Sequence, residues 1–261
     1  MRQRQQRVKR RHKKQAGSER SFPDPRLFTV RVTEIDGVPV KEDTFIYPVD
    51  RMRLSDGRVL AWHSPSLPAF YLMTAKALVD EGERERKQVM STIVAAPERV
   101  DYADANVKDD SLAMDALGKI GSAVILAAAA VEAHANEAIE QLDEKETVEI
   151  ERRGEKVTVA QPEMIRRLSI EEKLDLVLPK TTGKKSIKDK EPWPRFKKLN
   201  ELRGEVVHVK ARGQTDDPDV PSILGRLLKG DGSSCVDDAV AIITAYDDTV
   251  LPESTQKALG L

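Results

Sequence analysis

The sequence predicts an α+β protein, in which a bundle of helices carries an inserted β-hairpin and follows a small antiparallel sheet. Three observations indicate this class. Apolar and polar residues alternate with period two between residues 27 and 62, as in half-buried strands. From Ser66 onward the apolar residues recur at helical spacing. An alanine-rich stretch, residues 111–142, is long enough for a helix of about 48 Å.

The composition is that of a soluble, helix-rich chain. Of 261 residues, 33% are charged and only 4% are aromatic. No uninterrupted apolar run reaches the length of a membrane span, and no apolar segment follows the basic start as a signal peptide requires. The single cysteine, Cys235, has no partner for an internal disulfide. We therefore expect a cytoplasmic protein that does not associate with membranes.

Charge is distributed unevenly along the chain. Residues 1–14 hold eight Lys or Arg and no acidic residue, whereas the remaining 247 residues hold 35 basic and 44 acidic ones. We expect residues 1–20 to form a disordered basic tail. Its side chains, Arg10 and Arg11 among them, can bind RNA phosphates without reading sequence, or they can form a solvated leader with no function.

Residues 21–65 are predicted to form the β-rich region. Asp36-Gly37 and Asp56-Gly57 are tight-turn dipeptides between alternating segments, and together they favour a three- or four-stranded antiparallel sheet. Residues 66–251 are predicted to form the helical domain, and residues 252–261 a loosely held tail.

Within the helical domain, the expected first helix begins at Ser66, and its charged segment 81–87 (EGERERK) is interpreted as a solvated face. In the long helix 111–142, small side chains at residues 127–130 allow a second helix to approach closely. A hairpin is expected at 146–160, around Arg153-Gly154. The remaining helices are expected at 162–167, at 169–178 with a stop at Pro179, from 194 to about 212, at 221–229 and at 235–248.

The segment 194–210, PRFKKLNELRGEVVHVK, combines an amphipathic pattern with two residues capable of catalysis. Its predicted apolar face comprises Phe196, Leu199, Leu202, Val206, Val207 and Val209. Arg203 falls inside that face. A guanidinium among apolar neighbours requires an anionic partner or a ligand. His208 follows five positions later, about 140° around a straight helix, and histidine transfers protons near neutral pH.

Three acceptors are candidates to support these residues. Glu132 and Asn136 lie one turn apart on the long helix, and Glu132 is the expected partner of Arg203; alternatively both face water. Glu205 can pair with His208 and favour the imidazolium. Lys184 and Lys185, in the basic loop 180–190, are candidate RNA contacts or solvated charges. No metal ligand cluster is predicted, since the consecutive acids at 216–219 form a turn.

An Arg followed after four residues by a His at the end of a helix resembles the signature of the HEPN family. The order of the segments VEAHAN (131–136), LSIEEKL (168–174), WPRF (193–196) and LR (202–203) is similar to an uncharacterised bacterial branch of that family, over residues 110–248. The resemblance implies a helical bundle without a cofactor, which cleaves RNA to cyclic-phosphate ends in a cleft between two protomers. It also implies a toxin or phage-defence effector with an antitoxin or regulatory partner.

RNA cleavage without a metal needs a proton acceptor, a proton donor and a cation facing the phosphoryl group. His208 and Arg203 supply these types of group, so they are the predicted catalytic residues. Gly204 departs from the family, where Asn or Asp commonly follows the Arg. Two alternatives remain open: a catalytically inactive scaffold that binds nucleic acid or protein, in which Arg203 pairs with Glu132 and His208 caps its helix, and a nucleotide-binding regulator of a nucleotidyltransferase, on family analogy alone.

Overall fold

The computed structural model describes most of the helical region and short segments of the strands. The predicted basic tail, with Arg10 and Arg11, lies outside the described residues. The described residues are 26, 30–35, 38–46, 49–92, 94–95, 105–106, 109–208, 222–247, 251 and 253–260.

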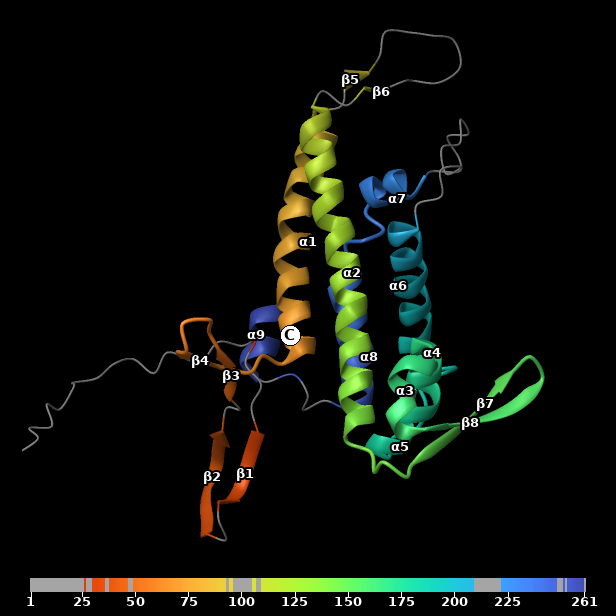
Figure 1. The fold of residues 1–261 in the computed structure, drawn as a ribbon. Coiled ribbons are helices and arrows are strands. Elements are labelled where there is room, and N and C mark those ends of the chain that lie inside the picture. The colour runs from red at the N-terminus through yellow and green to blue at the C-terminus, as the bar shows by residue number, and fades with distance from the viewer. Residues whose placement is uncertain are drawn as a thin grey trace, which may run out of the picture.

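The fold is an arrangement of long helices with small antiparallel β-ribbons at its periphery, which confirms the α+β class (Figure 1). Helix α1 (Leu67–Ser91) and helix α2 (Asp110–Glu140) run antiparallel along the length of the molecule. Helices α6 (Pro192–Val207) and α8 (Cys235–Tyr246) pack against α2. The shorter helical elements are α3 (Gln161–Arg167), α4 (Ile170–Glu172), the π-helix η1 (Lys173–Val177), α5 (Leu178–Thr182), α7 (Ile223–Lys229) and α9 (Glu253–Leu259).

The strands near the amino terminus form two separate ribbons, so the prediction of one three- or four-stranded sheet is wrong. Among the described residues, strand β1 (Val30–Ile35) pairs only with β2 (Val38–Ile46), and β3 (Val49–Arg53) only with β4 (Val59–His63). Every residue of β3 is exposed, and Val59 in β4 is 55% exposed, so the ribbon has no buried face among the side chains whose exposure the structure describes. Period-two alternation predicts a strand but does not specify its partner. A further short pair, β5 (Val94–Ala95) with β6 (Ala105–Asn106), was not predicted.

Helix α2 is the centre of the core. It begins where Asp109 accepts a hydrogen bond from the Leu112 backbone N–H, close to the predicted start. Ile120, Val124 and Val131 on its predicted stripe are buried, as are Ala127 and Ala130, whose small side chains permit α6 and α8 to pack closely. The core is therefore built around the alanine-rich stretch that the sequence singles out.

Helix α1 begins at Leu67, close to the predicted start, with Ser66 as its N-cap residue, and it continues through the charged segment 81–87. That segment is not only a solvated face, because Lys119 of α2 bridges to Glu81 (2.8 Å) and Glu85. At Gly82 the two helices approach so closely that a Cβ atom would lie 2.8 Å from Ile120 Cγ1. Charges and a glycine together fix the α1–α2 contact.

The predicted hairpin is present as β7 (Thr147–Arg152) and β8 (Glu155–Ala160), paired in register around the Arg153-Gly154 turn. Both turn residues have positive φ, 55° and 82°, which suits a two-residue hairpin turn. Val148, Ile150 and Val159 of the hairpin form a second apolar cluster with Ile139, Met164, Leu168 and Val177. The hairpin is thus anchored to the carboxyl end of α2.

Two predictions about where helices end are wrong. Pro179 does not end the helix that starts at Ser169. After the π-helix η1 it occupies the first turn of α5, where a missing N–H costs little. The segment 252–261, which was predicted to be loosely held, contains α9, which packs on α1, and its residue Leu259 is buried in the main core.

Helix α2 is also the one described helix whose length and apolarity would suffice to cross a membrane. The individual apolar runs are short, but alanines and glycines between them keep the mean hydropathy high. Half of its most apolar window is buried inside the protein, and it packs on α1, α6 and α8. Burial of this kind is also found in the core helix of a helical bundle.

Candidate functional site

Helix α6 places Arg203 at the border between the core and solvent. The helix begins with Pro192 and Pro194 in its first turn, where backbone N–H groups have no partner within the helix and the missing N–H of proline therefore costs nothing. Phe196, Leu199 and Leu202 of the predicted apolar face are buried, whereas Val207 of that face is 49% exposed. Arg203 follows Leu202 and is half-buried on the side that faces α2.

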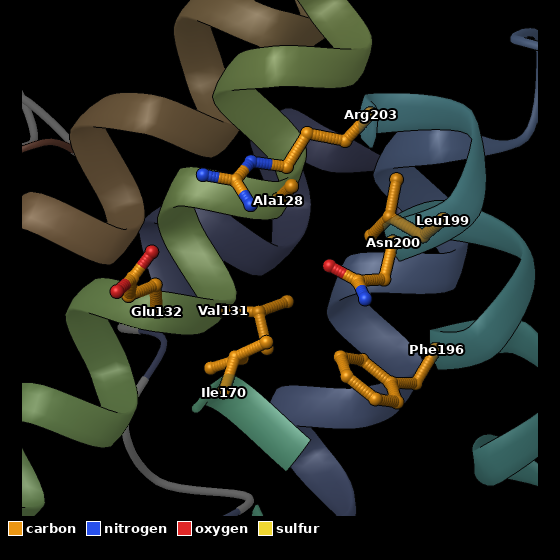
Figure 2. A pocket seen from close by; sticks show the side chains of 8 residues that line it. All are labelled: Ala128, Val131, Glu132, Ile170, Phe196, Leu199, Asn200 and Arg203. Carbon is orange, nitrogen blue, oxygen red and sulfur yellow. The ribbon is translucent and has the colours of Figure 1, made fainter. Parts of the chain in front are cut away.

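Arg203 lines a small cavity between α6, α2 and the start of α4. Its volume of about 10 Å³ has room for roughly one water molecule. In Figure 2, Arg203 reaches across to α2 with its guanidinium over Ala128, and the amide of Asn200 points into the gap between the helices. The other lining residues are Val131, Glu132, Ile170, Phe196 and Leu199.

The predicted ion pair between Arg203 and Glu132 is not formed. Glu132 instead accepts a hydrogen bond from the ammonium of Lys173 (3.3 Å), which also donates to Asn136 Oδ1 (2.9 Å). Glu132 and Asn136 therefore both contact Lys173, although the side chain of Glu132 remains 42% exposed to solvent. Within the part of the chain that the structure describes, Arg203 has neither a hydrogen bond nor an ion pair. Its guanidinium lines the cavity as an uncompensated positive charge.

Lys173 is the component of the site that the sequence reading missed. Its side chain is only 1% exposed, and it is the first residue of η1, which follows a capping box formed by Ser169 and Glu172. π-helical turns are rare and occur often at functional sites. A sequence signal did exist, because Ile170, Lys173 and Leu174 fall on one apolar helical stripe with Val177, and a lysine on such a stripe needs a partner.

His208 lies away from this cavity. Helix α6 ends at Val207, earlier than the predicted end near residue 212, and His208 is its exposed C-cap residue, whose backbone N–H donates to the Gly204 carbonyl. It has no described side-chain partner. The predicted Glu205–His208 pair is absent, because Glu205 pairs with Arg226 of α7 at 2.7 Å. One protomer does not bring Arg203 and His208 together.

The two candidate RNA-contact lysines also lie away from Arg203. Lys185 is exposed after α5. Lys184 is exposed at a different, larger cavity of about 280 Å³ that includes His134 and Glu137. His134 and Glu132, although only two residues apart on α2, line different cavities.

Taken together, the Arg203 cavity has the chemistry of an anion-binding site. A guanidinium offers several N–H donors, and the Asn200 amide one turn earlier offers another donor. Among the described residues, no group of three or more His, Cys, Asp or Glu side chains is placed to hold a metal ion. Comparisons with family models, with curated proteins and with solved structures returned no match for this chain.

Proposed function

We propose that the protein is a cytoplasmic, metal-independent endoribonuclease of the HEPN type, with Arg203 binding the scissile phosphate and His208 transferring the proton. The observation that supports this proposal is the half-buried guanidinium of Arg203, which has no carboxylate partner among the described residues. Lys173 already neutralises Glu132, so an incoming phosphate meets a net positive site. The role as a toxin or defence effector, held in check by an antitoxin or regulatory protein, belongs to the same proposal.

The chemistry requires few groups. The ribose 2′-oxygen attacks the adjacent phosphorus as its proton passes to a base, the bond to the 5′-oxygen breaks, and an acid protonates that oxygen. The products are a 2′,3′-cyclic phosphate and a 5′-hydroxyl. Arg203 stabilises the charge that accumulates on the phosphoryl oxygens, and an exposed imidazole at position 208 can serve as base or acid.

A second copy of the chain must complete the site. Five residues of helix separate Arg203 and His208 by about 7.5 Å along the axis and by about 140° around it, and His208 does not line the Arg203 cavity. An apolar groove of about 170 Å³ lies one turn further along the same helices and could seat the partner copy. It includes Ile125 and Leu224, which are 36% and 44% exposed.

The direct test is an RNA cleavage assay with the full-length protein in EDTA. Wild-type protein should produce cyclic-phosphate ends, whereas Arg203→Ala and His208→Ala should lower the rate about a hundredfold or more. Two matched controls remove the same side chains elsewhere. These are Arg195→Ala on the same helix and His63→Ala in β4, both of which should cleave like wild type. Equal product in all five samples would exclude the enzyme.

Mixing the two inactive variants tests whether the site spans two protomers. In a symmetric dimer, a heterodimer of Arg203→Ala and His208→Ala retains one intact site, so an equal mixture should recover roughly a quarter of wild-type activity. No recovery from a mixture that exchanges subunits would mean that both groups act within one protomer.

The alternative is an inactive scaffold that binds nucleic acid or protein. The segregation of charge favours it specifically, since the basic residues 1–14 precede an acidic body. This alternative predicts that deleting residues 1–14 weakens RNA binding and lowers its salt dependence, while Arg203→Ala and His208→Ala leave RNA intact.

A further inference from the structure

A polar cavity is lined by residues at the carboxyl ends of α2, α5 and α8. Its volume is about 280 Å³, and it shares no lining residue with the Arg203 cavity. The lining residues are His134, Glu137, Ala138 and Gln141 of α2, Thr181, Thr182 and Lys184 at the end of α5, and Tyr246 and Asp247 at the end of α8.

His134 is the unexplained residue of this cavity. Its side chain is 4% exposed, and its Nε2 atom is buried without a hydrogen-bond partner. No described residue donates to or accepts from either ring nitrogen. Burial lowers the pKa of His134 to about 4, against an opposing effect of Asp247, so the imidazole is neutral near pH 7. A buried polar group without a partner costs free energy unless a ligand satisfies it.

Glu137 lies one turn along α2 and contributes a carboxyl group to the same cavity. Burial, together with the charge of Glu140, raises the pKa of Glu137 to about 7, although the Leu67 backbone N–H at the start of α1 opposes that rise. At neutral pH the carboxyl group is therefore about half ionised. An incoming cation would shift it fully to the carboxylate.

The remaining polar groups are mostly acceptors. The hydroxyls of Thr181 and Thr182 already donate to the Leu178 carbonyl, and Thr182 Oγ1 also accepts from the Lys184 backbone N–H. What the two hydroxyls can offer a ligand is therefore their remaining lone pairs. The Tyr246 hydroxyl donates a hydrogen bond to the Leu174 carbonyl and accepts one from the Ile187 backbone N–H. The lining contains two carboxyl groups, those of Glu137 and Asp247, and one ammonium group, that of Lys184.

We propose that this cavity binds a small aliphatic amine, with Glu137 as the anionic partner of its ammonium group and His134 as a further acceptor. A donor-rich cation matches a lining that is rich in acceptors, and the side chain of Ala138 and the ring of Tyr246 suit an alkyl chain. A metal ion fits less well, since no three ligand groups among the described residues are placed to hold one. The proposal is independent of the Arg203 site.

Binding should release protons, because the ammonium group favours the ionised form of Glu137. The other charged or titratable groups around it are Glu140, Asp247, Lys184 and the neutral His134. Release should be largest below the pKa of about 7, where Glu137 starts protonated, and should vanish well above it. For the same reason the apparent affinity should fall about tenfold per pH unit below about pH 6.

The experiment is titration calorimetry of the full-length protein with cadaverine at pH 7, in two buffers of different ionisation enthalpy. The uncharged 1,5-pentanediol is the matched control ligand. We expect cadaverine to bind with an observed heat that depends on the buffer, which reports proton release, and the diol not to bind. Absence of cadaverine binding, equal binding of the diol, or binding without proton release would overturn the proposal.

Variants then assign the groups. Glu137→Gln keeps the shape but removes the charge, and should weaken cadaverine binding about tenfold or more and abolish proton release. Its control, Glu140→Gln, changes an exposed neighbour outside the lining and should retain binding. Equal affinity in the two variants would overturn the assignment. If Glu137→Gln fails to fold, the buffer dependence of the wild-type protein still decides the question.

Discussion

The two cavities beside α2 differ in the kind of polar group that lacks a partner. In the first, a permanently charged guanidinium is half-buried beside about 10 Å³ of space. In the second, a neutral imidazole is 4% exposed beside about 280 Å³. An unmatched cation near the surface recruits anions, whereas a buried acceptor beside a carboxyl group recruits a cation with N–H donors. The same structural signal therefore points to ligands of opposite charge.

The largest expected effect tests whether His134 is buried in its neutral form. Its pKa is lowered from 6.5 to about 4, so its stabilising contribution is fully present above pH 6.5 and is lost as the pH falls through 4. Replacing His134 with Leu removes that loss. We expect the variant to gain up to about 3 kcal/mol in free energy of unfolding, relative to wild type, between pH 6.5 and 4. Urea unfolding at several pH values measures the difference.

For Glu137 we expect the opposite dependence of stability on pH. Burial raises its pKa from 4.5 to about 7, so its contribution is fully present below pH 4.5 and is lost as the pH rises through 7. Relative to wild type, Glu137→Gln should therefore become more stable as the pH rises across this range. Parallel pH profiles for the two variants would contradict the environments assigned to both residues.

The second largest expected effect compares Lys173, which we consider structural, with Arg203, which we consider functional. Lys173 is 1% exposed and bonded to Glu132 and Asn136, so Lys173→Met leaves two acceptors without a donor. Since Glu132 is 42% exposed and can be rehydrated, we expect a loss of about 2 kcal/mol in free energy of unfolding. Arg203→Met has no bond to lose and should stay within about 0.5 kcal/mol of wild type. Comparable losses in both variants would mean that Arg203 is structural.

Periodicity in the sequence predicted the elements well but their partners poorly. Local patterns predicted the extent of α2, the hairpin at 147–160 and the burial of Phe196, Leu199 and Leu202 in α6, and these predictions are confirmed. The single amino-terminal sheet was wrong because alternation does not choose between strands. The end of α6 was placed too late because Val206 and Val207 continue the apolar pattern, although Val207 is 49% exposed.

The candidate site shows the same limit at the level of side chains. The sequence predicted that Arg203 would meet the face of α2 that carries Glu132, and both line one cavity. It could not predict that Lys173, brought in by a π-helical turn, would take Glu132 as its partner. Nor could it show that His134 would be buried without a hydrogen bond, since that depends on how α5 and α8 pack around it. Partner choice is a property of tertiary packing.

The smallest expected effect concerns Gly204, next to Arg203. A Cβ atom at this position would meet nothing within 4 Å, so packing gives no reason for a glycine there. Gly204→Ala should raise the free energy of unfolding by about 0.5–1 kcal/mol, because alanine is the better helix former. The contrasting variant is Gly82→Ala, whose Cβ atom would lie 2.8 Å from Ile120 Cγ1 and 3.2 Å from the Ala116 carbonyl oxygen, and it should destabilise the α1–α2 contact. Thermal unfolding of the two variants measures both signs. If Gly204→Ala instead loses stability, the helical turn that carries Arg203 must pack against a neighbour, as it would in a dimer of this chain. In that case the unfolding temperature should depend on protein concentration, because dissociation of the dimer accompanies unfolding.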